Sequence, residues 1–353
     1  MTQTLAIFLE AYRNLNSRKL FWIVLAISAL VVLAFACVGI NEKGIKVVAW
    51  QIDSSLFNAT TTPPAVFYKS MFTSVGIGLW LSWLATILAL ISTAGIFPDL
   101  MTSGSIDLLV SKPIGRLRLF LTEYVAGLLF VTLQVTVFTL LSFLVIGLRG
   151  GVWEPGLLVA VPLVICFFSY LFSVCVLLGI LTRSTVAALL LTLLFWFFVY
   201  GVGAAEQGLL VFKTMQNHGV DFQTMPREQA GRGPAVKGAK DRPESGGSST
   251  KDAPGPAEAP AGSPALDAAH RIVYGVKTVL PKTSETIALL QRTLVRMADL
   301  PEQPDQDQRM GAVQRELVET LRSRSVTWIV GTSLVFELAI LSWAAWLFCR
   351  RDF

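Results

Sequence analysis

The sequence predicts an all-α polytopic membrane protein with six transmembrane helices. Of its 353 residues, 53% are hydrophobic and only 15% are charged, and the apolar residues gather in long runs. A bilayer core about 30 Å thick needs roughly 20 apolar helical residues. Runs of that kind lie at residues 20–40, 73–96, 119–148, 156–181, 186–205 and 327–348. The first run is expected to stay in the mature chain, because no small-residue cleavage pattern follows it.

Composition excludes several classes of function. The net charge of +5 is too small and too scattered for the basic face of a nucleic-acid-binding protein, so no nucleic-acid partner is expected. The cysteines and histidines lack the spacing of a zinc site, and no metal site is expected. The sequence contains no Walker A, GxSxG or HExxH motif. We therefore expect no catalytic residues and no cofactor on this chain.

Basic residues in the short connections predict the orientation of the spans. A cytoplasmic N-terminus would place on that side Arg13, Arg18, Lys19, Lys112, Arg116, Arg118, Arg183, Arg350 and Arg351. The opposite side would hold only Lys43, Lys46, Lys69 and Arg149 in its short connections. The positive-inside rule then predicts that both termini are cytoplasmic. Short basic loops of this kind fit a multi-pass protein of the bacterial cytoplasmic (inner) membrane.

Residues 1–19 predict an N-terminal helix that lies in the cytoplasmic interface of the membrane. Its apolar residues share one helical face: Leu5, Phe8, Leu9, Tyr12 and Leu15. Polar residues occupy the other face, which is typical of an amphipathic interfacial helix. Such a helix is either a simple surface anchor or part of a docking surface for a cytoplasmic partner. Spans 1 to 5 then occupy residues 20–205.

Residues 206–326 predict a large extracytoplasmic insertion between spans 5 and 6. Its part at 226–264 is rich in Gly, Pro, Ser and Ala and has almost no large apolar residues, so we expect disorder there. Residues 284–324 predict two amphipathic helices. Their apolar positions are Ile287, Leu290, Leu294 and Met297 in one, and Val313, Leu317 and Leu321 in the other. The helices would cover each other or the outer ends of the bundle, or else form a lid that receives substrate.

The loop at residues 97–118, between spans 2 and 3, predicts a short cytoplasmic helix. Ser103 or Ser105 can cap it, and Pro113 ends it. A plain basic turn next to the membrane would explain the positive charges equally well, but it would not require the apolar run at 106–110.

This loop resembles a segment of the ABC-2 type transporter permeases, the six-span subunits of type V ABC exporters. The matching residues are Gly104-Ser105-Ile106-Asp107-Leu108-Leu109-Val110-Ser111-Lys112-Pro113-Ile114-Gly115-Arg116. The resemblance extends over about residues 4–205 and 273–353, with the N-terminal helix and six spans as weaker agreement. One departure is Thr122-Glu123-Tyr124 at the start of the third span, where relatives commonly carry a lysine.

The resemblance implies that this loop carries a coupling helix seated in a groove of a separate cytoplasmic ABC ATPase subunit. The contact would involve Gly104, Asp107, Lys112, Pro113 and Arg116. It further implies a homodimer of permease chains, ATP and Mg²⁺ bound by the ATPase partner rather than by this chain, and transport that usually runs outward.

Glu337 is the remaining candidate functional residue. The last span and its C-terminal tail occupy residues 327–353, and Glu337 lies near the middle of the span. A charged side chain is costly there and usually faces protein or water. It is either a translocation-path or gating residue, or a structural carboxyl hydrogen-bonded to Ser, Thr or Gln134 of a neighbouring helix.

The function expected from these features is the permease subunit of an ATP-driven ABC-2 type exporter. The alternative is a membrane scaffold that presents its extracytoplasmic helices and transports nothing. A secondary transporter or channel is disfavoured, because only Glu337 is deeply placed and the sequence has no inverted repeat.

Overall fold

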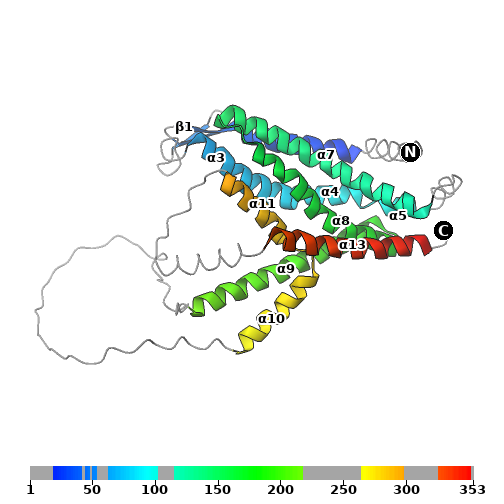
Figure 1. Ribbon diagram of the computed structural model, residues 1–353. Coiled ribbons are helices and arrows are strands. Elements are labelled where there is room, and N and C mark those ends of the chain that lie inside the picture. The colour runs from blue at the N-terminus through cyan, green and yellow to red at the C-terminus, as the bar shows by residue number, and fades with distance from the viewer. Residues whose placement is uncertain are drawn as a thin grey trace, which may run out of the picture. The chain divides into compact units, whose positions relative to one another are not determined.

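The computed structural model describes residues 19–41, 44–47, 50–53, 63–101, 115–217, 264–297 and 325–350 (Figure 1). Nearly all of them are helical, in agreement with the predicted all-α class. Three predicted segments lie outside the described residues: the interfacial helix at 1–19, the disordered stretch at 226–264 and the second amphipathic helix. The exceptions are Lys19, which begins helix α2, and Pro264, which begins helix α10. The chain forms two compact units. The first comprises residues 1–203, 276–303 and 324–353, and the second comprises 204–275 and 304–323.

Five helical segments in the described residues are long and apolar enough to cross a membrane. They are Pro64–Leu100, Arg116–Gly150, Pro155–Thr182, Thr185–Thr214 and Val326–Arg350. Each of these five segments contains one of the predicted apolar runs completely. The first predicted run corresponds to helix α2 (Lys19–Cys37), whose described apolar part, Trp22–Cys37, is shorter. The sixth span therefore remains a prediction, although the 19 residues of α2 extend about 28 Å.

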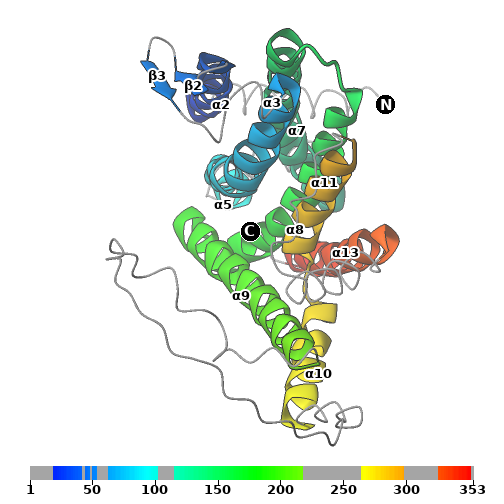
Figure 2. The ribbon, with the colours of Figure 1, turned by 90° about the vertical axis from the view of Figure 1, so that its left-hand side faces the viewer.

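A small antiparallel sheet follows α2, where the sequence predicted no strands. Its strands are β1 (Val38–Asn41), β2 (Gly44–Val47) and β3 (Trp50–Asp53), in the order β1-β2-β3. Figure 2 shows β2 and β3 beside the end of α2. The register pairs Val38 with Val47 and Val47 with Trp50, residue types that favour strands. The sheet ends the first helix earlier than its apolar run predicted.

The second candidate span is a chain of short helices rather than one regular α-helix. It consists of α3 (Pro64–Met71), η1 (Phe72–Ala85), α4 (Thr86–Thr93) and α5 (Ile96–Leu100). The η1 segment is a π-helix. The hydroxyls of Ser82 and Thr86 donate to carbonyl oxygens five residues earlier, at 2.6 and 2.7 Å. These bonds match the wider π turn.

The other spans are regular helices. They are α7 (Arg116–Gly150), α8 (Ala160–Thr182, after the short helix η2 at Pro155–Val159), α9 (Thr185–Asn217) and α13 (Val326–Arg350). Gly151, at φ 71°, ends α7, as expected for a left-handed helix terminus. Helix α9 continues well beyond the predicted end at residue 205. An apolar run at 209–212 continues the helix past the polar pair Glu206-Gln207.

Contacts between helix ends define two ends of the bundle. At one end, Tyr68 Oη donates to the Val38 carbonyl oxygen at 2.9 Å, and Lys69 pairs with Glu154. We call this the Lys69 end. At the other end, which we call the Arg116 end, the start of α7 meets the end of α13 through Arg116. Of the described basic residues that the sequence assigned to opposite faces, Lys69 and Arg149 lie at the first end and Arg116 lies at the second. That the Arg116 end faces the cytoplasm remains a prediction.

Helix α8 forms the centre of the first unit. Its residues Phe167, Phe168, Leu171 and Phe172 are at most 1% exposed, and α8 packs against α7, α11 and α13. Burial on nearly all sides agrees with its apolar character around the whole helix. The helix thus contacts α5, α7, α11 and α13, which carry most of the candidate site.

The first amphipathic helix of the insertion belongs to this bundle. Helix α10 (Pro264–Val279) is followed by a turn and by α11 (Thr283–Met297), and α11 packs against α8 and η1 (Figure 2). Leu290 is fully buried and Ile287 packs against the core, as their helical spacing predicted. The helix thus covers the bundle, the simpler of the two alternatives expected for it.

Candidate functional site

Most of the predicted coupling residues cannot be placed. Gly104, Asp107, Lys112 and Pro113 lie outside the described residues, which stop at Met101 and resume at residue 115. Arg116 is described and is the first residue of α7. The structure therefore describes how the two ends of the loop are anchored.

Arg116 joins the start of α7 to the end of α13. Its Nη1 donates a hydrogen bond of 3.2 Å to the carbonyl oxygen of Cys349. Carbonyl groups in the last turn of a helix have no partner within the helix, and a cation there also interacts favourably with the helix dipole. The Arg116 guanidinium, at the end of the loop, thus caps the C-terminus of α13.

An aromatic cluster fastens the other end of the loop to the same span. The Phe97 ring of α5 lies 5.1 Å from the Phe120 ring of α7 and 6.3 Å from the Phe348 ring of α13, between centroids. Phe120 and Phe348 are 5.8 Å apart. All three side chains are buried, and aromatic pairs at such distances are attractive beyond the area they bury. Both ends of the loop are therefore attached to α13.

Glu337 lies at a junction of α7, α8 and α13. Its Oε1 accepts a hydrogen bond from Tyr124 Oη, and its Oε2 accepts one from Ser169 Oγ, both at 2.7 Å. Glu337 is 7% exposed. The Ser169 oxygen also lies 2.9 Å from the Cys166 carbonyl oxygen, but its single proton serves only one acceptor at a time. Each carboxyl oxygen thus has its own donor within the protein.

The Tyr124 donor is held in place by close packing. Its ring stacks on Phe172 at 5.2 Å, with 12° between the planes. One turn further along α7, a Cβ added to Gly127 would lie 2.7 Å from Phe172 Cζ. Only glycine allows the ring to approach the helix so closely. Gly127 therefore fixes the ring on which Tyr124 rests.

One turn before Glu337, α13 also holds the turn between α10 and α11. Ser333 is fully buried, and its Oγ accepts a 3.0 Å hydrogen bond from the backbone N–H of Lys282. The Lys282 Nζ donates to Thr332 Oγ1 at 2.5 Å and lies 4.1 Å from the centre of the Trp328 ring, a cation–π contact. This turn therefore brings polar and charged groups beside the first half of the last span.

A buried ion pair braces the same turn. Lys277 Nζ lies 2.7 Å from Glu285 Oε1, and each side chain is 8% exposed. The pair links the end of α10 to the start of α11. A buried pair whose geometry is good fixes the arrangement of its elements, because losing one partner leaves an uncompensated charge.

The site contains residues that the sequence did not single out. Ser169 is of a residue type that the sequence suggested as a partner of Glu337, whereas Tyr124 was not suggested. Gln134 is not a hydrogen-bond partner of Glu337 within the described residues. Tyr124 lies ten residues before Gln134, about 15 Å along α7. The sequence shows which polar side chains lie within the apolar runs. It does not show which of them lie at the same depth in neighbouring spans. In the described residues no group of three His, Cys, Asp or Glu side chains gathers as a metal site would require.

The arrangement suits mechanical coupling and helix association better than bond-making chemistry. Both oxygens of Glu337 accept hydrogen bonds inside the bundle, as the structural alternative for this residue expects. Comparison with family models, with curated proteins and with solved structures gives no match.

Proposed function

We propose that this chain is the membrane-spanning permease subunit of an ATP-driven ABC-2 type transporter, working as an exporter. In this proposal two copies form the translocation path, and each docks a separate cytoplasmic ATPase subunit through the loop at 97–118. ATP and Mg²⁺ are bound by the ATPase, so this chain is not itself an enzyme. The protein would lie in the bacterial inner membrane with both termini in the cytoplasm.

The single observation that supports this proposal most is the double attachment of the loop. Arg116 bonds to the end of α13, and Phe97 packs between α7 and α13. A displacement applied between two attachment points is passed to the helices that carry them. A push on the loop by a partner would therefore move α7 and α13 together.

The same two helices hold the Glu337 junction. Tyr124 lies eight residues after Arg116, about 12 Å along α7 at 1.5 Å per residue. Glu337 lies twelve residues before Cys349, about 18 Å along α13. Because Glu337 also accepts from Ser169 of α8, a displacement at the Arg116 end would carry three spans as one block.

Charge reversal in the loop tests the proposal. The tagged chain is purified in mild detergent, and proteins that co-purify are identified by mass spectrometry for the wild type, Asp107→Lys and Lys112→Glu. An ABC ATPase should be recovered with the wild type and lost from both variants. The matched control is Arg183→Glu, a reversal in another connection predicted on the same face.

Two results would contradict the proposal. Recovery of the ATPase with the loop variants as efficiently as with the wild type would remove the loop as the docking site. Equal loss from Arg183→Glu would mean that any change of charge on this face disturbs binding. If no preparation contains an ATPase, the scaffold alternative is favoured instead.

A further inference from the structure

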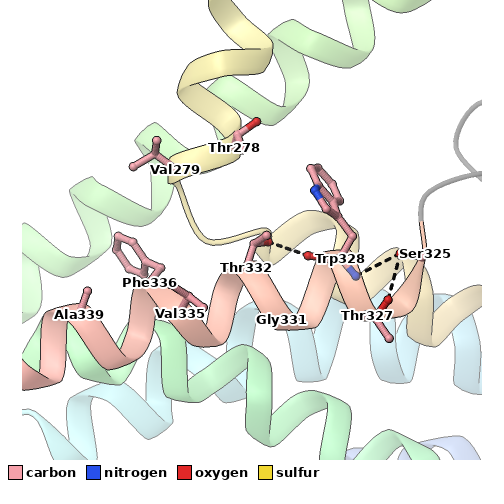
Figure 3. Close-up of a pocket in the computed structure, with 10 residues that line it drawn as sticks. All are labelled: Thr278, Val279, Ser325, Thr327, Trp328, Gly331, Thr332, Val335, Phe336 and Ala339. Carbon is pink, nitrogen blue, oxygen red and sulfur yellow. Dashed lines mark hydrogen bonds between the residues drawn. The ribbon is translucent and has the colours of Figure 1, made fainter.

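A groove runs along the outer face of α13 on the side of the turn after α10. Its volume is about 760 Å³. Figure 3 shows its wall on α13 from Ser325 to Ala339, with Thr278 and Val279 of α10 opposite. Gly331 lies in the middle of this wall, where the missing side chain leaves space. All lining residues belong to the first compact unit.

The groove has a polar end and an apolar end. Ser325, Thr327 and Thr332 supply hydroxyl groups to the part near the start of α13, whereas Val335, Phe336 and Ala339 line the other part. The fourteen residue steps from one end to the other measure about 21 Å at 1.5 Å per residue. Half of a bilayer core measures about 15 Å. The groove is therefore long enough to cross the hydrocarbon part of one leaflet and to reach into the head-group region.

Its charge is suited to an anion. Trp328 and Thr332, two of the lining residues, are the residues that the Lys282 ammonium group contacts. None of the described residues that line the groove is Asp or Glu. The Thr332 hydroxyl already donates to the Trp328 carbonyl oxygen at 2.7 Å, and Ser325 and Thr327 share one hydrogen bond. The second proton of the Ser325–Thr327 pair is left for a phosphate group, and the Lys282 cation directly behind the wall would attract that group.

The apolar end is exposed in the chain. Val335 is 67% exposed and belongs to α13, which is long and apolar enough to span a membrane. Val279, the last residue of α10, is 72% exposed. In a bilayer such residues contact lipid tails at no cost. A concave, leaflet-long surface with hydroxyls at one end has the shape and polarity of a single amphiphile.

We propose that this groove binds one acidic phospholipid. One acyl chain lies along Val335, Phe336 and Ala339, and the phosphate lies at the hydroxyl end near Lys282. The site belongs to the wall of the bundle and does not depend on the transport function proposed above.

Native mass spectrometry of the full-length protein tests this site. The protein is purified, stripped of lipid and given equal amounts of phosphatidylglycerol and phosphatidylcholine with the same acyl chains. The wild type should retain one phosphatidylglycerol per chain in preference to phosphatidylcholine. Ala339→Trp should reduce the retained fraction by at least about tenfold, because each displaced methylene weakens binding by roughly a factor of four.

Leu338→Trp is the matched control. Leu338 is the neighbouring residue, is 64% exposed and does not line the groove. This variant should keep the lipid, and both variants should elute as the wild type does in size exclusion. Equal retention by Ala339→Trp and the wild type would overturn the proposal, and so would equal loss from both variants.

The same spectra separate the other occupants. If Ala339→Trp changes the number of chains per particle, a second copy of this chain occupies the groove and the lipid proposal is wrong. Retention of phosphatidylcholine as strong as that of phosphatidylglycerol would contradict the assignment of an acidic head group. A wild type that binds neither lipid would also overturn the proposal.

Discussion

The hydrogen bond between Ser169 and Glu337 provides the sharpest test of the three-helix junction. The change is Ser169→Ala, measured in the wild type and in Glu337→Leu, which removes both carboxyl oxygens, as a double-mutant cycle. The bond is 2.7 Å long, and its loss leaves a buried carboxyl oxygen without a donor. Hydrogen bonds to charged groups contribute about 1.5–3 kcal/mol in soluble proteins, but interhelical ones in membranes average only about 0.6 and reach about 1.7 kcal/mol.

We therefore expect a coupling energy of about 1 kcal/mol between Ser169 and Glu337. The free energy of unfolding is measured by denaturant titration in mixed micelles. Ser173→Ala is the control, because Ser173 lies one turn further along the same helix, is also fully buried and bonds only to the carbonyl oxygen of Tyr170, at 2.8 Å. This control removes the same atom without touching the junction.

The Ser173 cycle with Glu337→Leu should give a coupling energy within about 0.3–0.5 kcal/mol of zero, as independent sites do. If the Ser169 cycle is equally small, the carboxyl group does not tie α8 to α13. Coupled motion of three spans would then lose its physical basis.

The remaining predictions concern packing, the braced turn and transport. Gly127→Ala should destabilise the protein by about 1–3 kcal/mol, because the added carbon overlaps a buried ring. Gly201→Ala, with nothing within 4 Å, should be neutral or stabilising in the same thermal unfolding assay. Glu285→Ala should cost about 3–5 kcal/mol, because it removes the carboxylate that is paired with the buried Lys277. The exchanged pair, Lys277→Glu with Glu285→Lys, should recover part of this loss in that assay. Glu337→Gln should impair transport while assembly is preserved if the carboxyl acts in gating, and normal transport in vesicles would leave it a purely structural role.

The sequence predicted the spans well because length and apolar composition decide whether a helix crosses a bilayer. Their ends were harder to predict. Helix α9 passes through Glu206 to Asn217, since an apolar run beyond a charged residue continues a helix. Strands β1 to β3 occupy only four residues each, too few for a periodic pattern to emerge beside a long apolar helix.

The candidate site was predictable only in part. A carboxyl group in the middle of a span signals a buried partner, so Glu337 was found from the sequence. Its partners were not, because Tyr124 and Ser169 lie 213 and 168 residues away along the chain. The spacing of residues within one helix does not determine which residues of another helix it contacts. The anchoring role of Arg116 was likewise hidden, since its acceptor is a backbone carbonyl that any residue would supply.

The measurement that tests the central claim most directly is an ATPase assay on the tagged chain purified from its native host. The account predicts that a protein with Walker A and B motifs co-purifies in amounts comparable to this chain. It also predicts that ATP hydrolysis by the preparation disappears when the Walker A lysine of that partner is replaced. Recovery of this chain from several detergents without a nucleotide-binding protein and without ATP hydrolysis would contradict the permease account.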